Sequence, residues 1–243
     1  LYMANNPAMK VYIQIKADPS RLAGTMSIIF GTNSAGFILA PMIGGYLADR
    51  FGIRAVFVIA AAVFAVSSTL VTFIRHAPYV PEGGAPRPRE IWGNRSFRRY
   101  LSFCSLGFLA VFVAQPFVSP YLAQVHGQTY AALGVFAALA SLGATVLSPS
   151  AGRVADRWGT RAGIGLLLCL TTLGVLALLF GPGPIAWGLA MLFCGGFDAF
   201  RYVAYGVCSR SFGALERAWG YGVFDAVMGL PMVGGALLGG LLY

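Results

Sequence analysis

Apolar residues fill this chain in stretches of about 20, and most of its charged residues lie between the stretches. A helix needs about 20 apolar residues to cross a bilayer core of about 30 Å. Transmembrane strands would instead alternate in polarity over segments of about 10 residues, a pattern that this chain does not show. We therefore predict seven transmembrane helices, at residues 22–48, 54–75, 99–124, 129–152, 160–180, 184–208 and 218–243.

Residues 1–15 are too short and too polar to cross a membrane, with Asn5, Asn6, Pro7 and Lys10 close together. We expect them to be the end of an earlier helix. Seven spans and a helix stub make an all-α membrane protein.

Composition supports a membrane location, because 58% of the residues are apolar and only 10% are charged. Soluble domains carry about 25% charged residues, and a soluble fold of this size could not bury so much apolar surface. We expect a multi-pass protein of the cell (inner) membrane, with the lipid bilayer as its surroundings.

Basic residues predict the orientation, since cytoplasmic loops are enriched in Lys and Arg. Alternate connections hold only Arg50 and Arg54, whereas the others are strongly basic. The predicted cytoplasmic segments are therefore 16–21, 76–98, 153–161 and 209–217. The net charge of +9 is scattered through short loops, so we read it as a topology signal and expect no nucleic-acid partner.

A Pro- and Gly-rich segment divides the chain at residues 76–98 and cannot continue either neighbouring helix. We expect residues 1–75 to be the remainder of an N-terminal bundle, 76–98 a cytoplasmic linker, and 99–243 a C-terminal bundle. The pentapeptide PMIGG at residues 41–45 recurs as PMVGG at 231–235. This repeat indicates either two related halves or only the small residues that let membrane helices approach closely.

Three motifs give the chain a resemblance to a known family. GRVADRWGTR at residues 152–161 is similar to the cytoplasmic GxxxDRxGxR signature of the major facilitator superfamily, in the copy between helices 8 and 9. GGYLADRFGIR at 44–54 has the same pattern and resembles the turn between helices 5 and 6 of that family. GFILAPMIGG at 36–45 resembles the helix 5 motif GxxxGPxxGG of proton-coupled exporters, with Ala40 in place of the second glycine. The helix-packing residues of this motif are Gly36, Pro41, Gly44 and Gly45.

This resemblance implies a partial two-bundle major-facilitator fold, running from the end of helix 4 to helix 11, without helices 1–3 and 12. It implies a secondary active transporter that moves a small solute by alternating access, coupled to protons and exporting drug-like molecules. It also implies a monomer when complete. The runner-up is a facilitator-type uptake carrier for sugars or organic anions.

The signature at 152–161 combines an acid and two bases in what we predict to be a short turn at the headgroups. Ion pairs there stabilise the protein little when they are exposed to water and more when an interface closes around them. The turn could therefore latch one state of the two bundles. The alternative is a tight turn that only marks topology. The gating residues would be Gly152, Asp156, Arg157, Gly159 and Arg161.

Charged residues inside predicted spans are candidates for function, because each costs roughly 2.5–3.5 kcal/mol at a helix centre. Asp198 and Arg201 are three residues apart and share a helix face. Asp198 could bind a coupling proton or the substrate, or the two could form a buried structural pair. Asp225 has no evident partner in the sequence, so we expect it to line a cavity or to meet a helix beyond this chain.

Polar and aromatic residues of two spans suggest a cavity surface for amphipathic or cationic solutes, with ordinary packing as the alternative. Tyrosine and glutamine carry polar tips that need partners. The candidates are Gln115, Tyr121, Tyr202 and Tyr205.

Two other classes fit less well. A seven-helix receptor or retinal pump matches the helix count, but a retinal pump needs a buried lysine in a late helix and the chain has only Lys10 and Lys16. An enzyme is not expected, since the sequence has two histidines and no HExxH, GxSxG or phosphate-loop motif. We therefore expect no catalytic residues, metal site or cofactor.

Overall fold

The computed structural model describes residues 22–73, 92–210 and 217–243, and throughout these ranges the regular structure is helical, with no strand. The predicted stub at 1–15 and most of the predicted linker at 76–98 lie outside the described residues. The division into two bundles therefore stays a prediction. Side chains of several residues within the helices, among them Asp156, Tyr202 and Tyr205, also lie outside the description.

The helices follow the predicted spans closely. Five of them are long and apolar enough to cross a membrane within the described residues. These observations confirm the expectation of an all-α membrane protein. In chain order the helices are α2 (Leu22–Phe51), α3 (Ile53–Thr72), α5 (Arg95–Gln124), α6 (Tyr130–Trp158), α7 (Thr160–Phe180), α8 (Pro184–Cys194), α9 (Gly196–Arg210) and α10 (Arg217–Leu242).

One predicted span, 184–208, is divided into α8 and α9 at Gly195. Gly195 takes part in the backbone bonding of both helices, because its N–H donates to the Met191 carbonyl of α8 at 3.0 Å and its carbonyl accepts from Ala199 N–H of α9 at 3.1 Å. A Cβ at Gly195 would fall on the Ala140 carbonyl of α6. The break therefore lies where this span presses against α6, and glycine is the residue that permits the contact.

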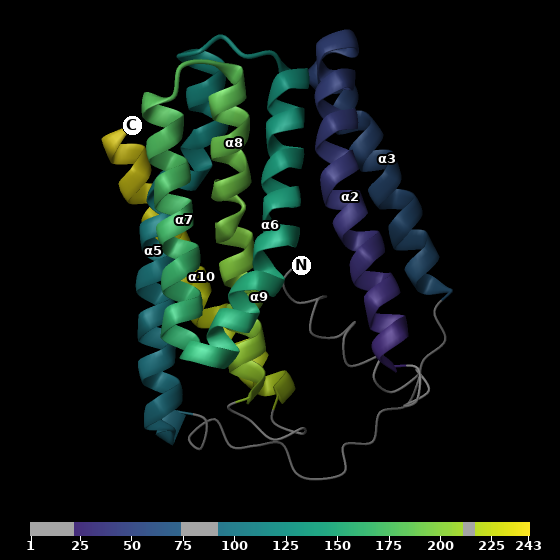
Figure 1. Cartoon of the computed structure of the whole chain (residues 1–243). Coiled ribbons are helices and arrows are strands. Elements are labelled where there is room, and N and C mark those ends of the chain that lie inside the picture. Colours follow the sequence, from purple (N-terminus) through teal and green to yellow (C-terminus); the bar gives the residue numbers. More distant parts are fainter. Residues whose placement is uncertain (1–21, 74–91, 211–216) are drawn as a thin grey trace.

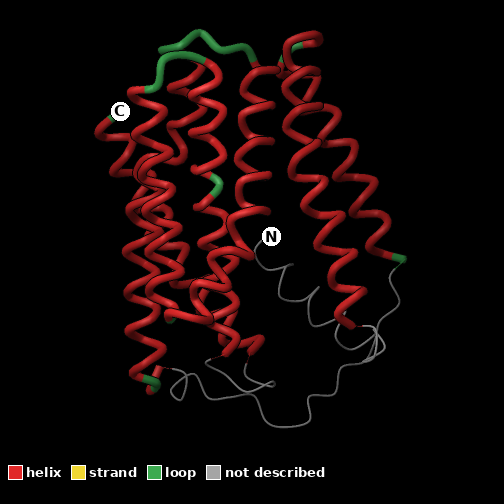
Figure 2. Tube along the Cα trace, in the orientation of Figure 1, coloured by secondary structure: helices red, strands yellow, loops and turns green. Residues whose placement is uncertain are grey.

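Helices α5 to α10 form one bundle, and α2 packs along α6 at its side with α3 packed on α2 (Figure 1). The path of the chain through the helices is drawn in Figure 2, where the loops that join α5 to α6 and α7 to α8 lie together at one end. Within the bundle, α10 packs along α5, while α6 contacts α7, α8 and α9. Helix α6 thus connects α2 to the rest of the molecule.

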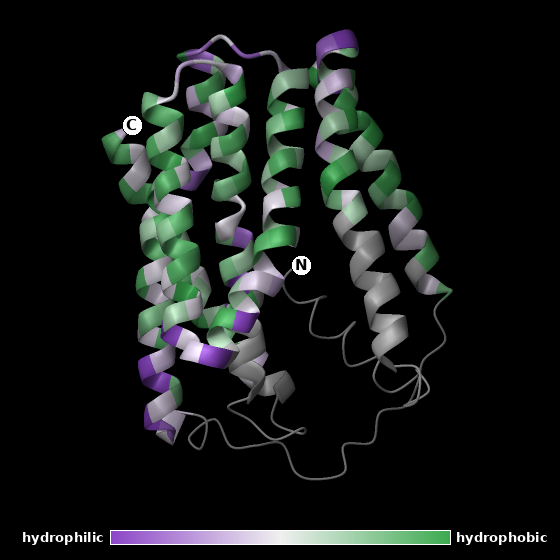
Figure 3. Ribbon diagram, in the orientation of Figure 1, coloured by the Kyte–Doolittle hydropathy of each residue, from purple (hydrophilic) through white to green (hydrophobic). Residues whose placement is uncertain are grey.

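Apolar side chains are buried between the helices and also cover the outside. The main buried cluster joins α5, α7, α9 and α10 around Phe108, Phe200 and Phe224. None of the residues of α3 between Ile53 and Leu70 is buried. Hydrophilic residues gather towards the helix ends, with apolar residues along the lengths between them (Figure 3). Such a surface suits lipid chains.

Glycines allow the helix backbones to touch where helices pair. A Cβ at Gly45 of α2 would fall on the Tyr130 carbonyl oxygen of α6, and a Cβ at Gly134 would fall on the Pro41 carbonyl oxygen. On the other side of the molecule, a Cβ at Gly235 of α10 would lie 2.7 Å from the Leu109 carbonyl oxygen of α5. Gly45 and Gly235 are the last residues of the two copies of the pentapeptide repeat, so both copies place a glycine at a helix crossing.

The neighbouring glycines of α2 provide a direct test of this packing. A Cβ at Gly44 would meet no atom within 4 Å, in contrast to Gly45. We expect Gly45→Ala to destabilise the protein by about 1–3 kcal/mol, as overpacking does. Gly44→Ala should be neutral or slightly stabilising, because alanine favours a helix more than glycine does. Thermal unfolding in detergent would measure both, and an equal effect of the two substitutions would contradict the assigned contact.

Candidate functional site

A cavity of about 230 Å³ lies between α5, α9 and α10. Helix α10 contributes most of its wall through positions 225, 228, 229 and 232, which share one helix face because they are three, four and seven residues apart. The lining residues are Phe108, Arg201, Phe224, Asp225, Met228, Gly229, Met232 and Val233.

Two charged side chains of opposite sign face this cavity, Arg201 from α9 and Asp225 from α10. The rest of the lining is apolar, so the local dielectric is low and charges act on one another more strongly than at a wet surface. The sequence left two alternatives for Asp225, a cavity wall or a contact with a helix beyond this chain, and in the structure it lines this cavity together with Arg201. The sequence did not indicate that these two residues, 24 positions apart, would share a cavity.

Asp198 lies in the first turn of α9 and is half-buried. Its carboxylate interacts electrostatically with Arg201, one helical turn further on. The N-terminal end of a helix also favours a negative charge through its dipole. Asp198 is not among the residues that line the cavity, so Arg201 stands between a carboxylate of its own helix and a carboxylate across the cavity.

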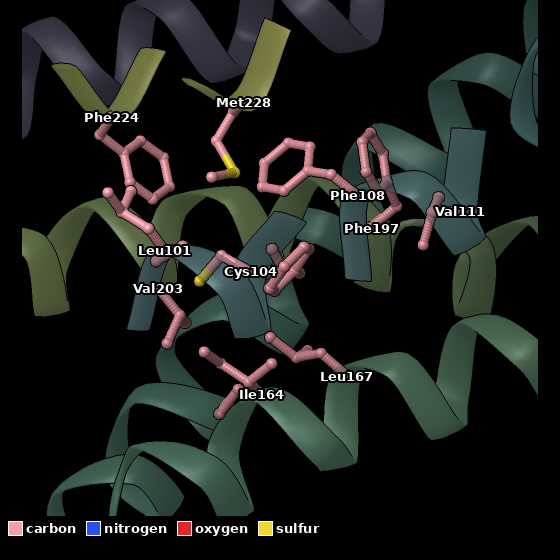
Figure 4. Close-up of a cluster of buried hydrophobic side chains, with 14 of the residues drawn as sticks. Leu101, Cys104, Phe108, Val111, Ile164, Leu167, Phe197, Val203, Phe224 and Met228 are labelled. Carbon is pink, nitrogen blue, oxygen red and sulfur yellow. The ribbon is translucent and has the colours of Figure 1, made fainter. Parts of the chain in front are cut away.

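Aromatic rings pack beside the cavity and hold its helices together. The Phe108 ring centroid lies 5.0 Å from that of Phe200, 5.9 Å from that of Phe197 and 6.4 Å from that of Phe224. Figure 4 shows Phe108, Phe197, Phe224 and Met228 facing one another between α5, α9 and α10. Edge-to-face and tilted pairs of this kind stabilise the packing beyond the burial of their area.

The sequence did not indicate Phe108, Met228 and Met232 as cavity residues. The two methionines could have been found by following the helical period from Asp225, since they lie three and seven residues beyond it. Phe108 had no such signal, because one phenylalanine among 18 in the chain is indistinguishable from ordinary packing without the neighbouring helices.

The polar candidates of α5 lie away from this cavity. Gln115 is exposed, and Tyr121 packs its ring edge-on against His126 with 5.1 Å between centroids. His126 in turn packs on Trp187, at 4.2 Å between centroids. Tyr121 therefore belongs to an aromatic cluster near the loops at one end of the bundle. For Tyr202 and Tyr205 only the backbone of α9 is described, and their assignment stays a prediction.

The signature at 152–161 forms a shorter turn than the sequence suggested. Helix α6 continues through Arg157 to Trp158, and α7 begins at Thr160, so Gly159 alone connects them. Its φ of 90° and ψ of 157° belong to a region that only glycine adopts readily. Arg157 and Arg161 are exposed on the two helix ends, and a Cβ at Gly152 would meet no atom within 4 Å.

The other copy of the signature folds in the same way. Gly52, with a φ of 79°, alone connects α2 to α3. In each copy the connecting glycine lies three positions after the aspartate. The Gly52 carbonyl accepts a hydrogen bond from Ala55 N–H at 3.1 Å, and the Gly159 carbonyl accepts one from Ala162 N–H, also at 3.1 Å. The DRxG pattern therefore encodes a one-residue reversal between two antiparallel helices.

A family model described as Major Facilitator Superfamily matches residues 3–200 and 101–243, which together cover nearly the whole chain. The chain belongs to the major facilitator superfamily. It is therefore part of a multi-pass membrane protein of a transporter family, as the resemblance of its motifs implied.

Curated relatives resemble this chain at moderate identity. The multidrug resistance protein MdtG of Dickeya zeae (strain Ech586) is 29% identical over 197 residues, which are 76% of this chain and 47% of that protein. The multi-drug resistance efflux pump PmrA homolog of Lactococcus lactis subsp. lactis (strain IL1403) is 26% identical over 258 residues, covering 100% of this chain and 63% of that protein. The chain thus spans about half to two thirds of the length of these relatives.

One solved structure shares the fold, with a TM-score of 0.56 and 19% sequence identity. It is the crystal structure of a bacterial homolog to the human lysosomal transporter Spinster, in an inward-facing and unoccupied conformation. The match covers 91% of this chain and 55% of that chain.

The one-residue reversal at Gly159 gives a second test. We expect Gly159→Ala to destabilise the protein by about 1–3 kcal/mol, the cost of forcing a residue with a Cβ into this backbone conformation. Gly152→Ala, seven residues earlier on α6, is the matched control, because its Cβ would enter open space. Thermal unfolding of the two variants in detergent measures the difference. A Gly159→Ala protein as stable as the Gly152→Ala control would contradict the strained turn.

Proposed function

We propose that the full-length transporter containing this chain exports amphipathic or cationic small molecules in exchange for protons, by alternating access. The observation that carries this proposal is the cavity between α5, α9 and α10, in which Asp225 and Arg201 face an otherwise apolar wall. Ionisable residues inside membrane-spanning helices are costly and mark ion or substrate pathways in membrane proteins.

The wall of the cavity suits solutes of varied shape. Met228 and Met232 are flexible and polarisable, and Phe108 and Phe224 add aromatic surface. Methionine-rich and aromatic surfaces adapt to different apolar ligands. An aromatic face also attracts a cation. A transporter that recognises drug-like molecules needs this tolerance more than it needs a fixed set of hydrogen bonds.

Asp225 supplies the coupling step in this proposal. In its charged form the carboxylate attracts a cationic solute that enters the cavity from the cytoplasm. When the cavity opens outward, a proton binds the carboxylate and removes its charge, so that the solute is released. The proton then leaves on the cytoplasmic side after the transporter returns. Arg201 keeps the cavity close to neutral while Asp225 is charged.

The names of the relatives support export as the direction of transport, since they describe a multidrug resistance protein and an efflux pump. The Arg201 guanidinium supports a second candidate, an uptake carrier for organic anions, because arginine binds carboxylates in a bidentate manner. The two proposals differ in the charge of the solute and in the direction of movement, which the following assay separates.

Asp225→Asn in the full-length transporter tests the coupling step. In proteoliposomes with an imposed pH gradient, we expect ethidium transport driven by the gradient to fall at least about tenfold, since a neutral amide cannot exchange a proton. Asp225→Glu should retain part of the gradient dependence because it keeps the carboxyl group. Undiminished pH-driven transport by Asp225→Asn would refute the assigned role. Gradient-driven uptake of an aromatic carboxylate in place of ethidium export would favour the anion carrier.

Asp198→Asn distinguishes a coupling role from a structural one. If Asp198 only balances Arg201 within α9, we expect the variant to lower the unfolding temperature while pH-gradient-driven transport per folded molecule stays unchanged. If Asp198 also carries a proton, transport should lose its dependence on the gradient. Full pH-dependent transport by the variant would rule out the proton role.

A further inference from the structure

The end of α2 is joined to the start of α6 by a carboxylate. Both oxygens of Asp49 accept hydrogen bonds from backbone N–H groups of α6, one from Tyr130 at 3.0 Å and one from Ala131 at 2.9 Å. These contacts link residues 81 and 82 positions apart. Asp49 lies in the signature copy at 44–54, for which the sequence predicts no gating role.

The first N–H groups of a helix have no partner within that helix, and the helix dipole favours a negative charge beside them. In α6 the next donor, Ala132 N–H, is bonded at 3.2 Å by the side chain of Thr129, the residue that caps the helix. The cap of α6 is therefore shared. Thr129 accepts a hydrogen bond from its own helix, whereas Asp49, on a different helix, accepts from the two earlier N–H groups of α6.

The same region is where α2 and α6 come closest. Gly45 and Gly134 permit direct backbone contact one turn from Asp49 and Tyr130. Along the face of α6 that carries Gly134, Ala138 is 5% exposed, whereas Thr145, two further turns on, is exposed. Figure 1 shows the two helices side by side at the end that carries Asp49 and apart at the other.

We propose that Asp49 is a latch that holds α2 against α6 and stabilises the state closed on this side of the membrane. The distribution of basic residues predicts that this side is outside the cell. Opening to the outside would separate α2 from the start of α6, so both hydrogen bonds and the contact with the helix dipole would break. The latch thus biases the transporter towards the state open to the cytoplasm.

This inference rests on the proposed alternating access, because only a transporter with two states has an equilibrium to bias. It does not depend on the solute or on proton coupling. The test therefore measures conformation directly, with no solute and no gradient. A failed latch would leave the proposed role of Asp225 intact, and a failed role of Asp225 would leave the latch intact.

Cysteine labelling in the full-length transporter measures how accessible reporter positions are from each side of the membrane. The native cysteines are replaced, and single reporters Ala138→Cys and Thr145→Cys are introduced separately. Ala138 is buried on the face of α6 that carries Gly134, and Thr145 lies on the same face two turns further on. In Asp49→Asn, we expect a membrane-impermeant maleimide added outside to label Ala138→Cys about threefold faster, the order of effect of a charge at a helix N-terminus. Labelling of Thr145→Cys from the cytoplasmic side should slow.

A second variant removes the donor in place of the acceptor. Tyr130 is the first residue of α6, where proline is tolerated, and Thr129 already has the extended backbone that precedes proline, with ψ at 161°. Tyr130→Pro therefore deletes one N–H to which Asp49 bonds while α6 remains intact. Tyr130→Ala is its matched control, because it removes the same side chain and keeps the N–H.

Arg50→Gln is the control for surface charge, since Arg50 is exposed beside Asp49 and its guanidinium lies 5.5 Å from the Tyr46 ring. Faster labelling at Ala138→Cys with slower labelling at Thr145→Cys, in Asp49→Asn and Tyr130→Pro but in neither control, is the expected result. Unchanged labelling of Ala138→Cys in both test variants overturns the latch. Faster labelling of both reporters overturns it as well, because it indicates a loosened bundle in place of a shift between two states.

Discussion

Helices in a lipid bilayer gain little by burying apolar side chains against one another, because lipid chains are as apolar as leucine. What holds them together is close contact between backbones, and small residues permit that contact. In this protein, glycines stand where α2 meets α6, where α6 meets the break between α8 and α9, and where α10 meets α5. The cavity and the Asp49 contact both depend on the positions of helices that these glycines set.

Helix α6 has a central place in this arrangement. One face carries Gly134 against α2, and another carries Gly143, where a Cβ would fall on the Leu192 carbonyl of α8. A shift of α2 would therefore reach the span that contains Asp198 and Arg201 through one rigid helix. The charged cavity lies on the far side of that span. The end of α2 and the cavity are thus connected by packed elements without sharing a residue.

The sequence was sufficient to predict where the helices lie along the chain, but not which helices contact one another. Apolar length predicted the ends of every described span to within six residues, because the thickness of the bilayer imposes it. It did not predict the break at Gly195, which exists only because α6 lies against it. Nor did it pair Arg201 with Asp225 in one cavity, since residues on separate helices meet through tertiary packing that no local pattern contains. The DRxG copies were recognised as motifs, but only the backbone at Gly52 and Gly159 revealed that each is a reversal of one residue.

That reversal has a consequence for how the helices can move in the folded protein. A connection of one residue leaves no slack between α2 and α3, or between α6 and α7. Neither helix of a pair can slide along its axis without pulling the near end of the other with it. For α2 and α3 the shared tip also carries Asp49, so a displacement of either helix at this end acts on the contact with α6. The glycine at the tip thus makes each pair a single mechanical unit.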